Sequence, residues 1–313
     1  MILDLGLVVA GLVVLLLAGD YLVRGAVNLA LRLGIPAVMV GMTVVAFGTS
    51  APELLVAVQA VLRDADGLAL GNVVGSNTAN ILLVIGLPAL IAPMAMARES
   101  QRDYIIMLVA TALFGALALT GAVGLWQALV LLAAFSLFMG DSILRARRAR
   151  MSPEELEGAD PGLPGPKLAF FLGLGIVGLP LGAHLLVTGS VNIAAALGVS
   201  EVVIGLTIVA IGTSLPELAT TAMAAWRREG GVALGNIIGS NLFNLLFILG
   251  VAGLFGRIDI PQQVIAFDFW VMLAASLVLA PFLWTGRDIG AGMGAILLLA
   301  YAGYLWSLVP AGG

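Results

Sequence analysis

The feature that most constrains the fold of this chain is an internal repeat. A shift of 164 residues aligns residues 41–57, GMTVVAFGTSAPELLVA, with residues 205–221, GLTIVAIGTSLPELATT, with ten identities in seventeen positions. The same shift aligns residues 70–86, LGNVVGSNTANILLVIG, with residues 234–250, LGNIIGSNLFNLLFILG, with nine identities in seventeen. Self-similarity on this scale indicates two copies of one structural unit.

Composition places both copies in a membrane. Of the 313 residues, 61% are hydrophobic and only 10% are charged, and the mean hydropathy is +1.13, whereas soluble domains carry about a quarter charged residues. The chain has no cysteine and one histidine, which excludes thiolate metal sites and makes a histidine-based zinc site or catalytic triad remote. The opening MILDLGLVV lacks a basic segment and a cleavage site, so we expect the first apolar stretch to be retained as a span.

Ten apolar stretches are long enough to cross a bilayer, which takes about 20 residues each. They lie at about 3–31, 36–62, 68–94, 104–121, 124–145, 168–197, 201–225, 232–256, 265–284 and 289–309. The sequence therefore predicts an all-α polytopic membrane protein with ten transmembrane helices.

The longest polar interval divides these spans into five and five. This interval, residues 145–167, contains four arginines, several acids, prolines and glycines. We predict a first five-helix repeat over 1–145 with its strongest repeat segment at 41–86, a linker over 146–167, and a second repeat over 168–313 with its segment at 205–250. Because each half has an odd number of spans, the copies must be inverted, as in secondary transporters whose site lies between the halves. Some channels share this feature.

Basic residues predict the orientation. With the 146–167 linker in the cytoplasm, twelve basic residues fall in inner loops, and only Arg63 and Arg257 fall in outer loops. Lys and Arg concentrate on the cytoplasmic side of membrane proteins. We expect a multi-pass protein of the cell membrane with both termini outside.

A breaker motif recurs in the middle of the second and seventh spans, as GTSAPE at 48–53 and GTSLPE at 212–217. Proline and glycine should interrupt the helix there at the midplane, and unpaired carbonyls are tolerated only where they face protein, water or a ligand. The oxygens that could meet a cation are the carbonyls of Ala46, Thr49, Ala210 and Thr213 and the hydroxyls of Thr49, Ser50, Thr213 and Ser214.

Each breaker ends in a glutamate, Glu53 or Glu217, with no basic residue within eight positions. An ionised carboxylate at the bilayer centre costs about 2.5–3.5 kcal/mol and usually marks an ion pathway. The alternative is a protonated glutamate hydrogen-bonded inside the bundle. Recurrence of the same residue after the same breaker favours the ion pathway.

A second motif, GNxxGSNxxN, lies at 71–80 and 235–244. Ser76 and Asn80 share one helical face, as do Ser240 and Asn244. For these four we favour ion ligands over interhelical hydrogen bonds, whereas Asn72, Asn236 and the motif glycines suit helix packing. The pooled set of carboxylates, amides, hydroxyls and carbonyls is hard oxygen, which suits Ca²⁺ or Na⁺ and argues against zinc or copper.

These paired motifs resemble the α-repeats of the cation/Ca²⁺ exchanger superfamily, and most of all the prokaryotic sodium/calcium exchangers. The resemblance implies a Ca²⁺/Na⁺ antiporter that works by alternating access, with the first and sixth helices sliding past the ion-binding core. It implies Ca²⁺ ligation by Glu53 and Glu217 with backbone oxygens of Thr49 and Thr213. It implies Na⁺ sites lined by Ser50, Ser214, Ser76, Ser240, Ala46 and Ala210, with Asn80 and Asn244 at the centre.

One departure bears on coupling. Some members carry an acidic residue at the position of Asn244, and the potassium-dependent branch has one in this region, so the two neutral Asn residues suggest exchange without K⁺. Serine and asparagine after the GN pair favour Na⁺ over H⁺, yet a Ca²⁺/H⁺ antiporter stays the first alternative. A cation channel is the next, and an intramembrane aspartic protease is remote. We expect no enzyme activity, no cofactor and no nucleic-acid partner; the oligomeric state stays open.

Other polar residues have structural interpretations. Asp20 and Arg24 are spaced to pair on one helix, as are Asp141 and Arg145. His184, which aligns with Asp20, is predicted to be buried and hydrogen-bonded, with a proton relay as the alternative. The acidic segment 154–160 is predicted to be a solvated linker and not a Ca²⁺ sensor.

Overall fold

The computed structural model describes residues 2–96, 100–148, 163–197 and 210–308. The first half contains α1 (Ile2–Leu33), α2 (Ala37–Val40), the π-helical segment η1 (Gly41–Val45), α3 (Ala46–Thr49), α4 (Ala51–Val61), α5 (Asp66–Leu82), α6 (Gly86–Ile91), α7 (Gln101–Ala118), β1 (Ala122–Val123) and α8 (Leu125–Arg148). The second half contains α9 (Gly165–Ala196), α11 (Ala210–Thr213), α12 (Leu215–Trp226), α13 (Gly230–Leu242), the π-helical segment η5 (Phe243–Ile248), α14 (Leu249–Phe255), β2 (Ile258–Asp259), the π-helical segment η6 (Val264–Asp268), α15 (Phe269–Val278), α16 (Ala280–Thr285) and α17 (Ala291–Leu308).

The helices follow the predicted apolar stretches closely. In the described residues, eight helices are long and apolar enough to cross a membrane, and the bent pair Ala37–Thr49 and Ala51–Val61 makes up to nine. Of the predicted seventh span, 201–225, residues 201–209 lie outside the described part of the chain, and α11 and α12 form the rest. The all-helical membrane fold is confirmed, and the count of ten spans and their inversion stay predictions.

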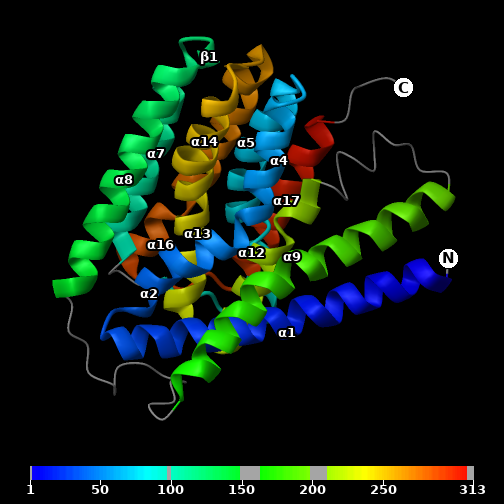
Figure 1. Ribbon diagram of the computed structural model, residues 1–313, viewed down its shortest axis with the longest axis vertical. Coiled ribbons are helices and arrows are strands. Elements are labelled where there is room, and N and C mark those ends of the chain that lie inside the picture. The colour runs from blue at the N-terminus through cyan, green and yellow to red at the C-terminus, as the bar shows by residue number, and fades with distance from the viewer. Residues whose placement is uncertain (1, 97–99, 149–162, 198–209, 309–313) are drawn as a thin grey trace.

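The centre of the bundle is formed by α5 and α13, which are the most buried of the long helices (Figure 1). Apolar side chains cover the outside instead, and Leu137 and Leu299 are 75% and 73% exposed. This distribution suits a lipid surround, where exposed apolar side chains carry no penalty. The two central helices therefore hold their polar residues away from the periphery.

Helices α1 and α9 lie side by side across one flank of the bundle, oblique to the other helices (Figure 1). Their contact is lined by glycines. A Cβ on Gly11 would lie 2.8 Å from the carbonyl of Gly182, and one on Gly175 would lie 2.5 Å from Cβ of Leu22. Small residues let membrane helices approach closely without interlocking side chains.

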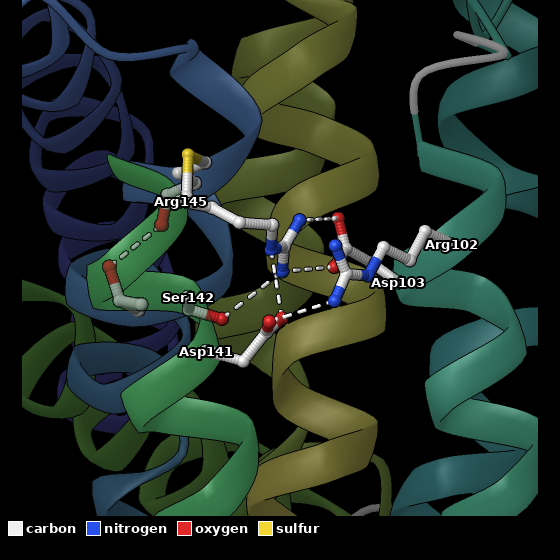
Figure 2. A network of polar contacts seen from close by, with 7 residues as sticks. Arg102, Asp103, Asp141, Ser142 and Arg145 are labelled. Carbon is white, nitrogen blue, oxygen red and sulfur yellow. Dashed lines mark hydrogen bonds and ion pairs between the residues drawn. The ribbon is translucent and has the colours of Figure 1, made fainter. Parts of the chain in front are cut away.

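A charged cluster joins α7 to α8 (Figure 2). Arg145 contacts the buried Asp103 at 2.6 Å and Asp141 at 2.9 Å, and Arg102 contacts Asp141 at 2.7 Å. Ser142 accepts a further hydrogen bond from Arg145. The predicted pair between Asp141 and Arg145 is confirmed as part of this larger network.

The predicted pair between Asp20 and Arg24 is also confirmed, at 3.0 Å. Asp20 has a second partner, Arg227, which follows α12, so the pair also ties α1 to α12. The prediction for His184 was wrong: it is exposed on α9, because its face of the helix points away from the bundle. The acidic segment 154–160 lies outside the described residues.

Between spans, β1 and β2 form a two-residue antiparallel ladder that pairs Ala122 with Asp259 and Val123 with Ile258. It joins the loops that follow α7 and α14 at one end of the bundle.

Candidate ion-binding site

The two breaker motifs adopt the same local structure. Ser50 separates α3 from α4 with φ −86° and ψ 8°, and Ser214 separates α11 from α12 with φ −85° and ψ 3°. A proline follows two residues later in each copy, where its missing N–H costs no helical hydrogen bond. The helix bends by 47° at Ser50. The predicted interruption is therefore confirmed in position, as a kink over a single residue.

The carbonyls at the two kinks differ in their partners. The carbonyl of Ala46 accepts hydrogen bonds from the Ser50 N–H at 3.0 Å and from the Thr49 hydroxyl at 3.3 Å. In the second copy the Ser214 N–H donates to Ile211 at 3.0 Å, and Ala210 is the first residue of α11. A cation at Ala46 must therefore share an oxygen that already accepts from the protein.

Glu53 and Glu217 lie in the first turns of α4 and α12, and each is 1% exposed. The positive end of a helix dipole stabilises a negative charge at this position. One oxygen of each carboxylate, Oε2, is buried and has no hydrogen-bond partner, and neither glutamate has an ion pair among the described residues. A cation between the two carboxylates would compensate both charges.

The motif serines do not cap the helices that follow them. Ser50-x-x-Glu53 and Ser214-x-x-Glu217 match the capping-box pattern, but neither serine side chain makes a cap hydrogen bond. Ser50 Oγ instead donates to Oε1 of Glu217 at 3.1 Å, and Ser214 Oγ is buried without a hydrogen-bond partner. Neither hydroxyl is used as a helix cap, so both remain available to the candidate site.

Two asparagines donate hydrogen bonds to the backbone carbonyls of the two glutamates. Asn72 on α5 donates to the backbone carbonyl of Glu53 at 3.1 Å, and Asn236 on α13 donates to that of Glu217 at 3.5 Å. Asn236 also donates to Thr221 at 3.1 Å and accepts from the Thr49 hydroxyl at 3.1 Å. The packing role predicted for Asn72 and Asn236 agrees with these contacts, and the two copies make equivalent bonds.

The remaining predicted ligands come from α5, α13 and η5. Ser240 Oγ lies 3.4 Å from Thr49 Oγ1. Asn80 donates to Oδ1 of Asn241 at 3.0 Å, while its own Oδ1 and both polar atoms of Asn244 are buried without partners. Of the twelve predicted residues, ten are buried: Ala46, Thr49, Ser50, Glu53, Ser76, Asn80, Ser214, Glu217, Ser240 and Asn244.

Thr213 is half-buried. Sequence reasoning missed Asn241, which contacts Asn80, and the sulfur of Met107, which accepts from Asn241 at 3.5 Å. The sequence contained a signal for Asn241, because an asparagine follows the serine in both copies of the second motif. It contained no such signal for Met107.

Helical irregularities also flank the asparagines. Phe243–Ile248 is π-helical, and in the first copy the carbonyl of Ala79 accepts from both Leu83 and Val84, so a π-type turn lies at the matching place. Such bulges are frequent at functional sites because they turn side chains out of regular register.

The oxygen atoms of the candidate site suit a hard cation. In the described part of the chain, no three histidine or acidic residues cluster as a metal site. The candidate site consists of two carboxylates and a set of neutral oxygens, which come from α3, α4, α5, α11, α12, α13 and η5 and from the serines at the two kinks. Such a set suits an ion that passes through, because binding must be weak enough for release.

Comparison with known proteins agrees with this geometry. A family model described as sodium/calcium exchanger protein matches residues 3–143 and 167–309. The chain belongs to the sodium/calcium exchanger family. As a member of a family of exchangers, it is a multi-span membrane transporter of cations that include Ca²⁺.

Three similar proteins match over almost their whole length. The putative antiporter CaxA of Alkalimonas amylolytica is 39% identical, over 96% of this chain and 97% of its own. The sodium/calcium exchanger MaX1 of Methanosarcina acetivorans is 34% identical, over 94% and 95%. A solved structure of the sodium-calcium exchanger NCX_Mj is 32% identical, with a TM-score of 0.85 over 99% of this chain and 100% of that one.

Proposed function

We propose that this exchanger moves Ca²⁺ across the cell membrane in exchange for Na⁺. The observation that carries the proposal is the pair of buried carboxylates, Glu53 and Glu217, at matching kinks and without a basic partner among the described residues. Two negative charges balance one Ca²⁺, which favours six to eight oxygen ligands in flexible geometry. The names of the relatives MaX1 and NCX_Mj support Na⁺ as the counter-ion.

In this proposal Ca²⁺ is held by both glutamates and by the backbone oxygens of Thr49 and Thr213. Na⁺ takes the hydroxyls and carbonyls around them. Its ligands are Ser50, Ser214, Ser76, Ser240, Ala46 and Ala210, with Asn80 and Asn244 at the centre. Buried oxygens without protein partners on Glu53, Glu217, Ser214, Asn80 and Asn244 support these assignments.

Alternating access is proposed to arise from sliding of α1 and α9 over the core. The motif glycines support this, because they bring the kinks against α9. A Cβ on Gly48 would lie 2.8 Å from Ile176, and one on Gly212 would lie 2.5 Å from Val187, both residues of α9. Movement of α9 therefore acts directly on the two kinks. The ten-helix count, the inverted halves over 1–145 and 168–313, and the 146–167 linker belong to the same proposal.

The proposed orientation has both termini outside and the 146–167 linker in the cytoplasm. The asymmetry of basic residues supports it. Contacts group several predicted inner segments at one end of the bundle: Gln101 donates to Leu283 at 2.9 Å, and Met94 pairs with Ile289.

Vesicle flux tests the proposal. In vesicles that contain the purified protein, an outward Na⁺ gradient alone should drive saturable Ca²⁺ uptake, and vesicles with Glu53→Gln protein should serve as the inactive control. Uptake driven by an outward proton gradient and not by Na⁺ would replace the proposal with Ca²⁺/H⁺ exchange. Unsaturable ohmic conductance would indicate a channel.

A further inference from the structure

A chain of three side chains holds one of the proposed ion ligands in place. Asn80 donates from Nδ2 to Oδ1 of Asn241 at 3.0 Å, and Asn241 donates from Nδ2 to the sulfur of Met107 at 3.5 Å. All three residues are buried and lie on α5, α13 and α7. Because Asn80 donates with its nitrogen, its Oδ1 points elsewhere, and that oxygen has no protein partner.

The orientation of an amide decides whether it can bind a cation. An amide presents an acceptor oxygen on one side and two donor hydrogens on the other. If Asn80 turned over, hydrogens would face the ion in place of oxygen. A fixed Nδ2 therefore makes Asn80 a preorganised oxygen ligand.

The other half of the protein carries the same residues but does not make the same chain. The shift of 164 places Asn80 on Asn244 and Asn241 on Asn77. Neither polar atom of Asn244 has a partner, nor does Oδ1 of Asn77. Asn77 donates back to the carbonyl of Val73 at 2.7 Å. The hydrogen-bond chain between side chains is therefore made by Asn80 and Asn241, whereas the equivalent hydrogen-bond chain of Asn244 and Asn77 is broken.

The second, broken hydrogen-bond chain also has a methionine in the position equivalent to Met107. Met272 on α15 is fully buried, like Met107 on α7. YIIMLVAT at 104–111 aligns with FWVMLAAS at 269–276. Thr111 donates to the carbonyl of Met107, and Ser276 donates to that of Met272, each at 2.9 Å. Helix α7 packs against α13 and α15 packs against α5, so each methionine lies on a neighbour of the asparagine it would serve.

We propose that Asn241 and Asn77 are positioning residues that orient Asn80 and Asn244, and that the two chains alternate in the transport cycle. In the state described here Asn80–Asn241–Met107 is made, and in the oppositely facing state Asn244–Asn77–Met272 is made. The inference rests on the proposed function, since it assigns an orientation to two proposed ion ligands. Because the two hydrogen-bond chains have the same chemistry, exchanging one for the other changes the free energy of the protein little. The ion gradients then set the direction of transport.

Matched variants test this inference. Asn241→Leu removes the first chain and Asn77→Leu removes the second, with little change in size. In vesicles of known orientation, each should raise the KM for Ca²⁺ by roughly threefold to tenfold on one face only, as expected for the loss of one buried hydrogen bond. The affected faces should be opposite, and the maximal rate should change less than the KM.

A second readout does not require flux. The chain contains no cysteine, so Val23→Cys, at a fully buried position of α1, provides a single thiol. Maleimide labelling of this thiol should change in opposite directions in the Asn241→Leu and Asn77→Leu backgrounds, because the variants destabilise opposite states. If either variant fails to insert, Met107→Leu and Met272→Leu provide the same comparison with smaller shifts.

The inference would be overturned if the KM for Ca²⁺ rose equally on both faces, if labelling changed in the same direction in both variants, or if neither the KM nor the labelling changed. Asn241 and Asn77 would then serve only in helix packing. The wild-type vesicles separate this outcome from failure of the proposed function. If wild-type protein shows Na⁺-driven Ca²⁺ uptake, only the alternation is disproved. If it shows none, the proposed function fails, whereas opposed labelling shifts would still support two alternating chains.

Discussion

Ser50 Oγ donates a hydrogen bond of 3.1 Å to Oε1 of Glu217, although 167 positions separate the two residues. Both belong to the same motif, in different copies. A serine of one half thus holds the carboxylate of the other half, where a local cap would have been the simpler arrangement. This hydrogen bond joins the two kinks through residues that are proposed to bind the ion.

Neutralising either glutamate should nearly abolish Ca²⁺ transport. In Glu53→Gln and Glu217→Gln the amide keeps the shape, but one of the two charges that balance Ca²⁺ is lost. Radioactive Ca²⁺ uptake into vesicles measures the effect. Asp259→Asn, at an exposed position, is the matched control and should transport normally. Correctly inserted glutamine variants with near wild-type rates would disprove the site.

Removing the hydroxyl of Ser50 should weaken Ca²⁺ binding. A hydrogen bond to a charged group contributes about 1.5–3 kcal/mol, so the KM for Ca²⁺ in Ser50→Ala should rise by roughly tenfold or more. Ser136→Ala, which removes an exposed hydroxyl bonded only to Leu132 of its own helix, should leave the KM unchanged. An unchanged KM in Ser50→Ala as well would show that the bond to Glu217 does not matter for binding.

Exchange should proceed fully in medium without K⁺. Asn80 and Asn244 are neutral, so the centre has no third charge to hold K⁺ beside Ca²⁺. Initial rates of Na⁺-driven Ca²⁺ uptake with and without K⁺ give the answer, and an absolute K⁺ requirement would contradict it. Asn244→Asp should reduce transport less than Glu53→Gln does, because the added acid can stay protonated and still offers an oxygen.

Exchange should be electrogenic. With two deep carboxylates, a Ca²⁺-loaded centre is near neutral, whereas each Na⁺ beyond two leaves a positive charge. The membrane potential acts on such a charge with about 2.3 kcal/mol per 100 mV. Vesicles clamped with K⁺ and valinomycin should therefore show Ca²⁺ flux that depends on the imposed potential. Flux that is indifferent to potential would indicate two monovalent ions per Ca²⁺.

Adding a methyl group at Gly235 should destabilise the protein. A Cβ there would lie 2.4 Å from the carbonyl oxygen of Val38, so α13 and α2 would have to separate. Overpacking of this kind costs about 1–3 kcal/mol. Thermal unfolding in detergent should show a lower Tm for Gly235→Ala. Gly303→Ala is the control, because nothing lies within 4 Å of its added Cβ; equal Tm values for both variants would contradict the packing argument.

Sequence reasoning predicted the helices, the kinks and the buried candidate ligands because their causes are local. A stretch of about 20 apolar residues must span a bilayer as a helix, so the boundaries of α1, α8 and α17 agree with the predicted stretches within a few residues. The proline and glycine of the GTSAPE motif favour a break in the helix, and the kink lies within that motif, at Ser50. A carboxylate in an apolar stretch is costly, which singled out Glu53 and Glu217.

Local patterns were poorer guides to partners. The pattern Ser50-x-x-Glu53 predicts a helix cap, yet Ser50 bonds to the other half of the chain. The pair of Asp20 and Arg24 was predicted from their spacing, but the second partner, Arg227, was not. Periodicity says which residues share a helix face and does not say which other helix faces them.

The sequence by itself determined which residues are apolar enough to span, where the spans break, and which two carboxylates lie deep among them. Only the tertiary structure decided that Asn80 bonds to Asn241 and Asn241 to Met107, while Asn77 turns back to its own helix. Both hydrogen-bond chains are built from two asparagines and a methionine, so these residues alone do not distinguish the one that is made from the one that is broken. That difference arises from how the helices pack in one state, because a hydrogen bond between distant residues exists only where packing brings their atoms within reach.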